Sequence, residues 1–165
     1  MELKLSEKLL DALNKQVSME LQSAQIYNGM RIYLKELGAH GAINWMTNQA
    51  HEEIEHAEAF INFIQEMDGH VELDGMEPVK TVYDSPLAVW EAGLAHEKDI
   101  SSSILNLLKL ADEEGNYAAQ NFLRKFVDEQ VEEEDNFRGI IDLWKLAGNS
   151  PEALLKVDGI LGKRE

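Results

Sequence analysis

The sequence contains no cysteine, only three prolines and no long apolar run. Without cysteine, the chain can form neither disulfides nor thiolate zinc sites, and it has no thiol nucleophile. No apolar stretch reaches the roughly 18 residues that a membrane-spanning helix needs. The opening segment Met1–Lys4 has no signal-peptide pattern, so we expect a cytoplasmic protein. All three prolines lie after residue 77 and glycine is sparse within the periodic segments, which favours an all-α protein.

Positive charge is also scarce. Lysine and arginine number 15 against 31 aspartates and glutamates, so the formal net charge is −16. Such a chain repels nucleic acid and anionic membrane surfaces, whereas cations are natural ligands for it. A length of 165 residues predicts a single domain, 1–165, with a substantial core.

Apolar residues at helical spacing predict four long helices, which form a bundle over about 6–147, and a short fifth helix. The predicted ranges are 6–36, 40–68, 86–113, 117–147 and 151–161. Ser6 is a suitable N-cap for the first helix and Gly38 a suitable stop. A helix of this length spans about 45 Å, which is typical of a helix bundle. The short connection through Gly38 makes the first two helices an antiparallel hairpin.

Residues 69–85 interrupt the helical pattern with two glycines and a proline. Ser85 as N-cap and Pro86 at the first helical position then start the third helix. At about 3.3 Å per residue the interrupted stretch reaches roughly 55 Å, enough to run the length of the bundle. The third helix would therefore start at the same end as the second. This predicts a four-helix bundle with one long crossover between two hairpins.

Each long helix carries one glutamate where the apolar period requires a core residue. These residues are Glu20, Glu53, Glu97 and Glu133. Because each lies near the middle of its helix, all four should meet in one layer, whichever way each helix runs. Four carboxylates in an apolar layer repel one another and are driven towards protonation unless cations compensate them.

A metal site is the simplest such compensation. In Glu53-x-x-His56 an acid and an imidazole lie one turn apart on the same helix face. Two glutamates plus two Glu-x-x-His pairs make the ligand set of di-iron carboxylate bundles. Here the fourth helix has Gln130-x-x-Glu133 instead, so we expect an asymmetric dinuclear site. The first metal would have Glu20, Glu53 and His56, and the second Glu53 as a bridge, Glu97 and Glu133.

The role of Gln130 stays open between a weak oxygen ligand and a hydrogen-bond donor to the ligands. Oxygen ligands with one imidazole suit a first-row divalent ion better than a tight tetrahedral zinc site. A redox role favours iron, although the ligands also permit manganese or zinc. His51 and His96 adjoin site glutamates but fall off the apolar stripes, so we expect them to face solvent or another subunit.

Several longer motifs accompany these residues. They are Leu13-Asn14-Lys15-Gln16 with Glu20 and Tyr27, Asn44-Trp45-Met46, Glu52-Glu53-Ile54-Glu55-His56, His96-Glu97, Asn121-Phe122-Leu123 and Asp128-Glu129-Gln130-Val131-Glu132-Glu133-Glu134. Together they resemble the prokaryotic non-haem ferritins, which are ferritin-like di-iron carboxylate proteins, over essentially the whole length. The resemblance implies the ferritin-like bundle. It also implies a ferroxidase centre at Glu20, Glu53, His56, Glu97, Gln130 and Glu133.

The resemblance implies three further features. A third iron site would lie at Glu52, Glu129 and Glu132, which are otherwise read as surface acids. Tyr27 would lie next to the centre, where it is otherwise read as a core tyrosine bonded to a carboxylate. The function implied is iron storage, with Fe²⁺ oxidised by dioxygen or hydrogen peroxide and ferric mineral held in a homo-oligomeric cage of 24 subunits.

The short fifth helix is the sequence feature that supports a cage. Its apolar residues are Leu154, Leu155, Ile160 and Leu161. With so small an apolar face the short helix would not fold alone, so this face would be buried either at a symmetry axis or against its own bundle.

Related families fit less well. Bacterioferritins carry Glu-x-x-His in both halves, so Gln130-x-x-Glu133 argues against haem. Rubrerythrins add a cysteine-rich iron domain, which a chain without cysteine cannot form. DNA-protecting mini-ferritins place their metals between subunits and lack the fifth helix. Prokaryotic ferritins often have a tryptophan where this chain has Lys125-Phe126, so chemistry assigned to that tryptophan does not carry over. A non-storage di-metal oxidase or peroxidase and a scaffold with a vestigial site remain alternatives.

Overall fold

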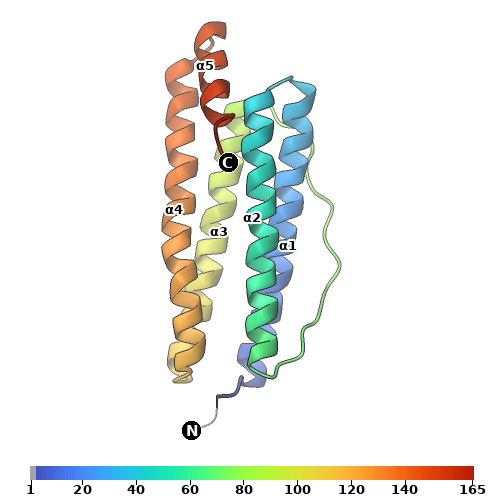
Figure 1. Cartoon of the computed structure of the whole chain (residues 1–165), viewed down its shortest axis with the longest axis vertical. Helices are drawn as coiled ribbons and strands as arrows, with labels where there is room; N and C mark the ends of the chain where they lie inside the picture. The colour runs from blue at the N-terminus through green and yellow to red at the C-terminus, as the bar shows by residue number, and fades with distance from the viewer. Residues whose placement is uncertain (1–2) are drawn as a thin grey trace.

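The computed structural model describes residues 3–165, so the first two residues of the segment Met1–Lys4 lie outside it. The helices are α1 (Glu7–Glu36), α2 (His40–Glu66), α3 (Pro86–Glu113), α4 (Tyr117–Ala147) and α5 (Pro151–Leu161). The four long helices lie side by side, and α5 sits at one end of the bundle against α2 and α4 (Figure 1). The predicted all-α bundle is confirmed, and within the described range there is no strand and no helix long and apolar enough to span a membrane.

Helix starts follow the capping residues of the sequence. Four helices begin at a side chain that accepts a hydrogen bond from the backbone N–H three residues on: Ser6, Ser85, Asn116 and Ser150. The exception is α2, whose N-cap residue Ala39 has no side-chain acceptor. Asp158 of α5 supplies it instead, accepting from the N–H groups of Gly41 and Ala42 at 3.0 and 2.8 Å. A carboxylate at a helix N-terminus is favourable, so this contact fastens α5 to the bundle.

The crossover between α2 and α3, residues 67–85, runs along the bundle beside α1 (Figure 1). The third helix therefore starts at the same end as the second, as predicted. Asn14 and Gln22 of α1 each donate to one backbone carbonyl of the crossover and accept from one of its N–H groups, over 2.8–3.0 Å. At Gly29 the crossover comes so close that an added Cβ would lie 2.3 Å from the carbonyl oxygen of Lys80. These contacts order a segment that has no regular structure of its own.

One predicted helix end is wrong. Helix α2 ends at Glu66 rather than at residue 68. Asp68 has a φ of 57°, which lies in the left-handed region and stops a right-handed helix.

Buried apolar side chains form two clusters, one at the α5 end of the bundle and one at the opposite end. On each long helix the stripe glutamate falls between the residues of the two clusters. The buried polar residues of this middle layer are Gln16, Glu20, Ser23, Gln49, Glu53, Glu97, Gln130 and Glu133. The core is thus two apolar halves separated by a polar layer, which positions the site.

Helix α5 docks against its own bundle with only part of its apolar surface. Val157 and Leu161 are buried in the adjoining cluster, and Leu154 packs partly against it. Leu155 and Ile160 remain 74% and 49% exposed. Helical spacing explains the split, because residues 154, 157 and 161 share one face of the helix.

Candidate metal centre

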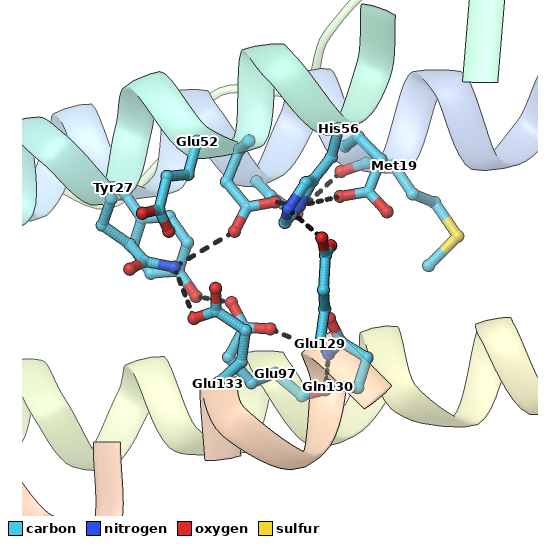
Figure 2. A network of polar contacts seen from close by, with 12 residues as sticks. Met19, Tyr27, Glu52, His56, Glu97, Glu129, Gln130 and Glu133 are labelled. Atoms are coloured by element: carbon cyan, nitrogen blue, oxygen red, sulfur yellow. Dashed lines mark hydrogen bonds and ion pairs between the residues drawn. The ribbon is translucent and has the colours of Figure 1, made fainter. Parts of the chain in front are cut away.

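The four stripe glutamates converge from four helices into one buried layer, as expected. Figure 2 shows Glu97 and Glu133 projecting from α3 and α4 towards the helix that carries His56. Glu20, Glu53 and Glu97 are each 1% exposed and Glu133 is 7% exposed. Glu20, Glu53 and His56 can each offer one ligand atom such that all three atoms lie within 4.8 Å of one another. The structure therefore brings together the set predicted for the first metal.

His56 lies among carboxylates on both sides of its ring. Its Nδ1 is 3.2 Å from Glu53 Oε2 and 3.9 Å from Glu20 Oε2, and its Nε2 is 3.1 Å from Glu129 Oε2. Burial alone would lower the pKa of His56, but the hydrogen bonds to Glu129 and Glu53 and the nearby negative charges raise it to about 11. The ring therefore holds a proton that a metal ion has to displace.

One carboxylate oxygen of Glu20 has no hydrogen-bond partner. Its Oε1 accepts a hydrogen bond of 2.9 Å from Gln16, whereas its Oε2 is buried without a hydrogen-bond partner. Burial, followed by the negative charge of Glu53, raises the pKa of Glu20 well above its usual value. A buried polar atom without a partner costs free energy, and a cation bound by Glu20, Glu53 and His56 would satisfy this oxygen. The residues present thus fit a divalent cation.

Glu97 is held by neutral donors. The Tyr27 hydroxyl, fully buried, donates to Glu97 Oε1, and Gln130 Nε2 donates to Glu97 Oε2 at 3.0 Å. Burial raises the pKa of Glu97, and these two hydrogen bonds oppose the rise. Tyr27 thus lies beside the centre and is also bonded to a carboxylate, so its two sequence-based interpretations are compatible.

Glu133 faces the centre from α4. Burial, with a further contribution from the charge of Glu97, raises the pKa of Glu133 to about 7, against the effect of a hydrogen bond from Gln49. The pKa of Glu53 is also raised, chiefly by burial. All four carboxyls of the layer are therefore shifted towards the protonated form, as their crowding predicts.

The three acids of the predicted third iron site line one surface pocket beside His56. Glu129 pairs with His56, Glu52 pairs with Arg164 at 2.9 Å, and Glu132 is exposed. Among residues 3–165, these acids do not gather as closely as the Glu20, Glu53 and His56 set. The third site therefore stays a prediction.

Two glutamines contact the centre in a way that the sequence reasoning missed. Gln49 is fully buried, and its Nε2 donates to Glu53 Oε1 at 3.2 Å and to Glu133 Oε2 at 2.9 Å. Gln16 makes the corresponding bond to Glu20. Both glutamines stand four residues before the stripe glutamate of their own helix, one turn away on the same face. This repeated Gln-x-x-x-Glu spacing in α1 and α2 was the signal available in the sequence.

The expectation for His96 was wrong. His51 is exposed as expected, but His96 turns towards α1. Its Nε2 lies 2.7 Å from Ser23 Oγ, and its ring meets that of Tyr27 edge-on with centroids 5.8 Å apart. Burial lowers the pKa of His96. The contact with Ser23 thus links α3 to α1 beside Tyr27.

Comparison with known proteins agrees with the fold. Residues 10–147 match the family described as Ferritin, a ferritin-like domain. A bacterial non-heme ferritin of Bacteroides fragilis is 38% identical over 160 residues, covering 97% of this chain and 99% of that protein. A bacterial non-heme ferritin of Campylobacter jejuni is 35% identical over 154 residues, covering 93% and 92%.

Solved structures give the same result. The structure of an open pore ferritin from the hyperthermophilic archaeon Archaeoglobus fulgidus superposes with a TM-score of 0.97 at 37% identity, covering 99% of this chain and 100% of that one. A form of the same archaeal ferritin engineered to be closed gives a TM-score of 0.96 at 38% identity, covering 98% and 99%.

Proposed function

This chain belongs to the ferritin family, whose members and fold support a role in iron storage, and we propose that it oxidises Fe²⁺ at a dinuclear centre within each subunit and stores the ferric product in the cytoplasm. The observation that carries the proposal is the buried set of Glu20, Glu53 and His56, in which one carboxylate oxygen has no hydrogen-bond partner. Buried ionisable groups destabilise an apolar core unless a cation binds to them and compensates their charge.

Iron is the substrate of this reaction. One Fe²⁺ would bind Glu20, Glu53 and His56, and the other would bind Glu53, Glu97 and Glu133. Each Fe²⁺ gives up one electron. Dioxygen takes up both electrons and two protons to form hydrogen peroxide, or hydrogen peroxide takes up the same electrons and protons to form two water molecules. The negative carboxylates favour the ferric state over the ferrous state and so lower the barrier to oxidation.

Other residues keep the ligands in place. Tyr27 and Gln130 hold the two oxygens of Glu97, and Gln49 spans Glu53 and Glu133. Such hydrogen bonds orient ligands and tune their affinity for metal. In this role Gln130 acts through Glu97, while its amide oxygen remains available as a weak ligand.

The acids outside the centre extend the proposal. The surface pocket beside His56 is lined by Glu52, Glu129 and Glu132. We assign to these acids a third iron site, whose iron would receive or relay the product. Storage also requires an enclosed volume. The exposed Leu155 and Ile160 of α5 support burial in subunit contacts of a homo-oligomeric cage, for which we propose 24 subunits.

Two substitutions test the centre. We expect Glu53→Ala and His56→Ala to abolish rapid Fe²⁺ oxidation in stopped-flow absorbance, because each removes a ligand of the first metal. Glu58→Ala, at an exposed position of the same helix and outside the pocket beside His56, is the control and should oxidise iron normally. All three variants should keep the particle mass of the unaltered protein. Wild-type rates in both ligand variants would refute the site.

One alternative differs in function rather than in chemistry. A non-storage di-metal oxidase or peroxidase would use the same ligands but would need no cage. Particle mass together with the iron bound per particle separates the two. A small oligomer that oxidises Fe²⁺ yet retains only about two irons per subunit would favour the alternative.

A further inference from the structure

Arg164, in the segment after α5, contacts Gln49 at the edge of the metal centre from outside the four-helix core. Its Nη1 donates to the carbonyl oxygen of Trp45 at 3.1 Å and to Gln49 Oε1 at 3.0 Å. Its Nη2 lies 2.9 Å from Glu52 Oε2, and its side chain is only 17% exposed. The guanidinium carbon stands 4.3 Å from the centroid of the Trp45 ring. A planar guanidinium can meet three acceptors and stack on an aromatic ring at the same time.

The position of Arg164 is fixed by the docking of α5. The Nδ2 of Asn44 donates to the backbone oxygen of Arg164 at 2.8 Å. Six residues earlier in the chain, Asp158 caps α2. Gly41 allows this approach, because an added Cβ there would lie 1.7 Å from the carbonyl oxygen of Asp158. The guanidinium is therefore delivered by several contacts of its backbone and of α5.

Gln49 links Arg164 to the ligands. A primary amide has one acceptor side and one donor side. The oxygen of Gln49 accepts from Arg164, so its NH₂ group faces Glu53 and Glu133. The reversed amide would turn its oxygen towards two carboxylates and its NH₂ group towards a cation, and both contacts would be repulsive. Arg164 thus selects the orientation in which Gln49 bridges a glutamate of α2 and a glutamate of α4.

We propose that Arg164 is a positioning residue for the dinuclear centre, acting through Gln49 to hold Glu53 and Glu133 in a geometry suited to metal binding. The proposal rests on the proposed function, since it assumes that these glutamates are ligands. It assigns to α5 and the segment after it a role inside the subunit, in addition to any role in assembly.

Metal binding measures this role without relying on turnover. The metal-free full-length protein is titrated with Co²⁺, and binding is followed by calorimetry and by the visible absorption of the bound ion. We expect Arg164→Gln to weaken binding about 10-fold, at the low end for residues that orient ligands, and to change the absorption spectrum. Arg164→Lys should behave similarly, because an ammonium keeps the charge but cannot reproduce the planar three-acceptor contact.

The matched control is Lys163→Gln, which removes the same charge from the exposed preceding residue and should bind Co²⁺ like the unaltered protein. Wild-type affinity in Arg164→Gln would overturn the proposal. Full rescue by Arg164→Lys would overturn it as well, because charge alone would then suffice. If the unaltered protein fails to bind two Co²⁺ per subunit, the proposed centre itself is wrong, which is a different result.

A double-mutant cycle tests the route through Gln49. Gln49→Ala should weaken Co²⁺ binding by itself, and adding Arg164→Gln to it should weaken binding no further. Additive losses would show that Arg164 acts independently of Gln49 and would overturn the relay. Particle mass and thermal midpoint are measured for every variant. If Arg164→Gln does not assemble, the same comparison is made with Arg164→Lys.

Discussion

Replacing Glu133 by glutamine should stabilise the metal-free protein while weakening its affinity for metal. The carboxyl of Glu133 is buried, and its pKa is raised from 4.5 to about 7, mainly by that burial. At pH 8 the folded protein therefore holds a buried negative charge at a cost in free energy. Glutamine has nearly the same shape and can still accept the hydrogen bond from Gln49, but it carries no charge. The substitution therefore removes the free-energy cost of the buried charge, and it also removes an anionic ligand of the metal.

The magnitude and its pH dependence follow from the two pKa values of Glu133. Because the folded-state pKa is higher than the unfolded-state value, ionising this carboxyl costs more in the folded state. That destabilisation is complete above about pH 7 and disappears below about pH 4.5. The two pKa values correspond to a loss in the free energy of unfolding of roughly 3 kcal/mol at pH 8 and about 1 kcal/mol at pH 5.5. For a chain of this size, the larger figure raises the thermal midpoint by roughly 6–12 °C.

Thermal unfolding of the metal-free variant and the unaltered protein, at equal protein concentration and at both pH values, checks this expectation. Glu132→Gln is the control, because it removes the same charge from the exposed preceding residue of α4 and should barely change the midpoint. A Glu133→Gln midpoint at or below that of the unaltered protein at pH 8 would contradict the reasoning. So would a gain in midpoint that fails to shrink between pH 8 and pH 5.5.

Three further outcomes are expected. Glu129→Ala should change the ratio of iron oxidised to oxygen consumed more than the initial rate, because Glu129 lies outside the proposed dinuclear set; an unaltered ratio in an oxygen electrode would count against a third iron. Metal binding near pH 7 should release at least one proton per subunit, because the pKa of His56 is about 11, and the affinity for metal should fall as the pH is lowered. Calorimetry in buffers of different ionisation heat measures the proton release, and a value of zero would contradict a ligand role for His56. Gly41→Ala should loosen α5 and destabilise the protein by about 1–3 kcal/mol, because its Cβ would overlap Asp158; limited proteolysis at α5 and thermal melting check this, with Gly139→Ala, where a Cβ meets nothing within 4 Å, as the control.

These outcomes have a common physical basis. The buried layer of Glu20, Glu53, Glu97 and Glu133 interrupts an otherwise apolar core, so the metal-free protein has carboxyls with raised pKa values and a buried oxygen without a hydrogen-bond partner. Groups retained at such a cost commonly serve binding or catalysis. Charge reduction at this layer should therefore increase stability and reduce metal binding together.

The sequence alone determined the helices, the long crossover and the layer of glutamates. Each of these depends on local information. Apolar spacing defines a helix face, capping residues such as Ser6 and Ser85 mark helix starts, and the length of the segment before Pro86 sets its reach. The position of Glu53 within an apolar stripe likewise requires only the helical period.

Tertiary structure decided the contacts between residues far apart in the chain. Arg164 and Gln49 are 115 positions apart, and Asp158 caps a helix that begins more than 100 residues earlier. No helical period relates such pairs, because they meet only after α5 has docked. The inward turn of His96 similarly involves a polar contact with Ser23 on a neighbouring helix. Helical periodicity thus placed the glutamates in one layer, whereas the packing of separate elements decided which side chains orient them.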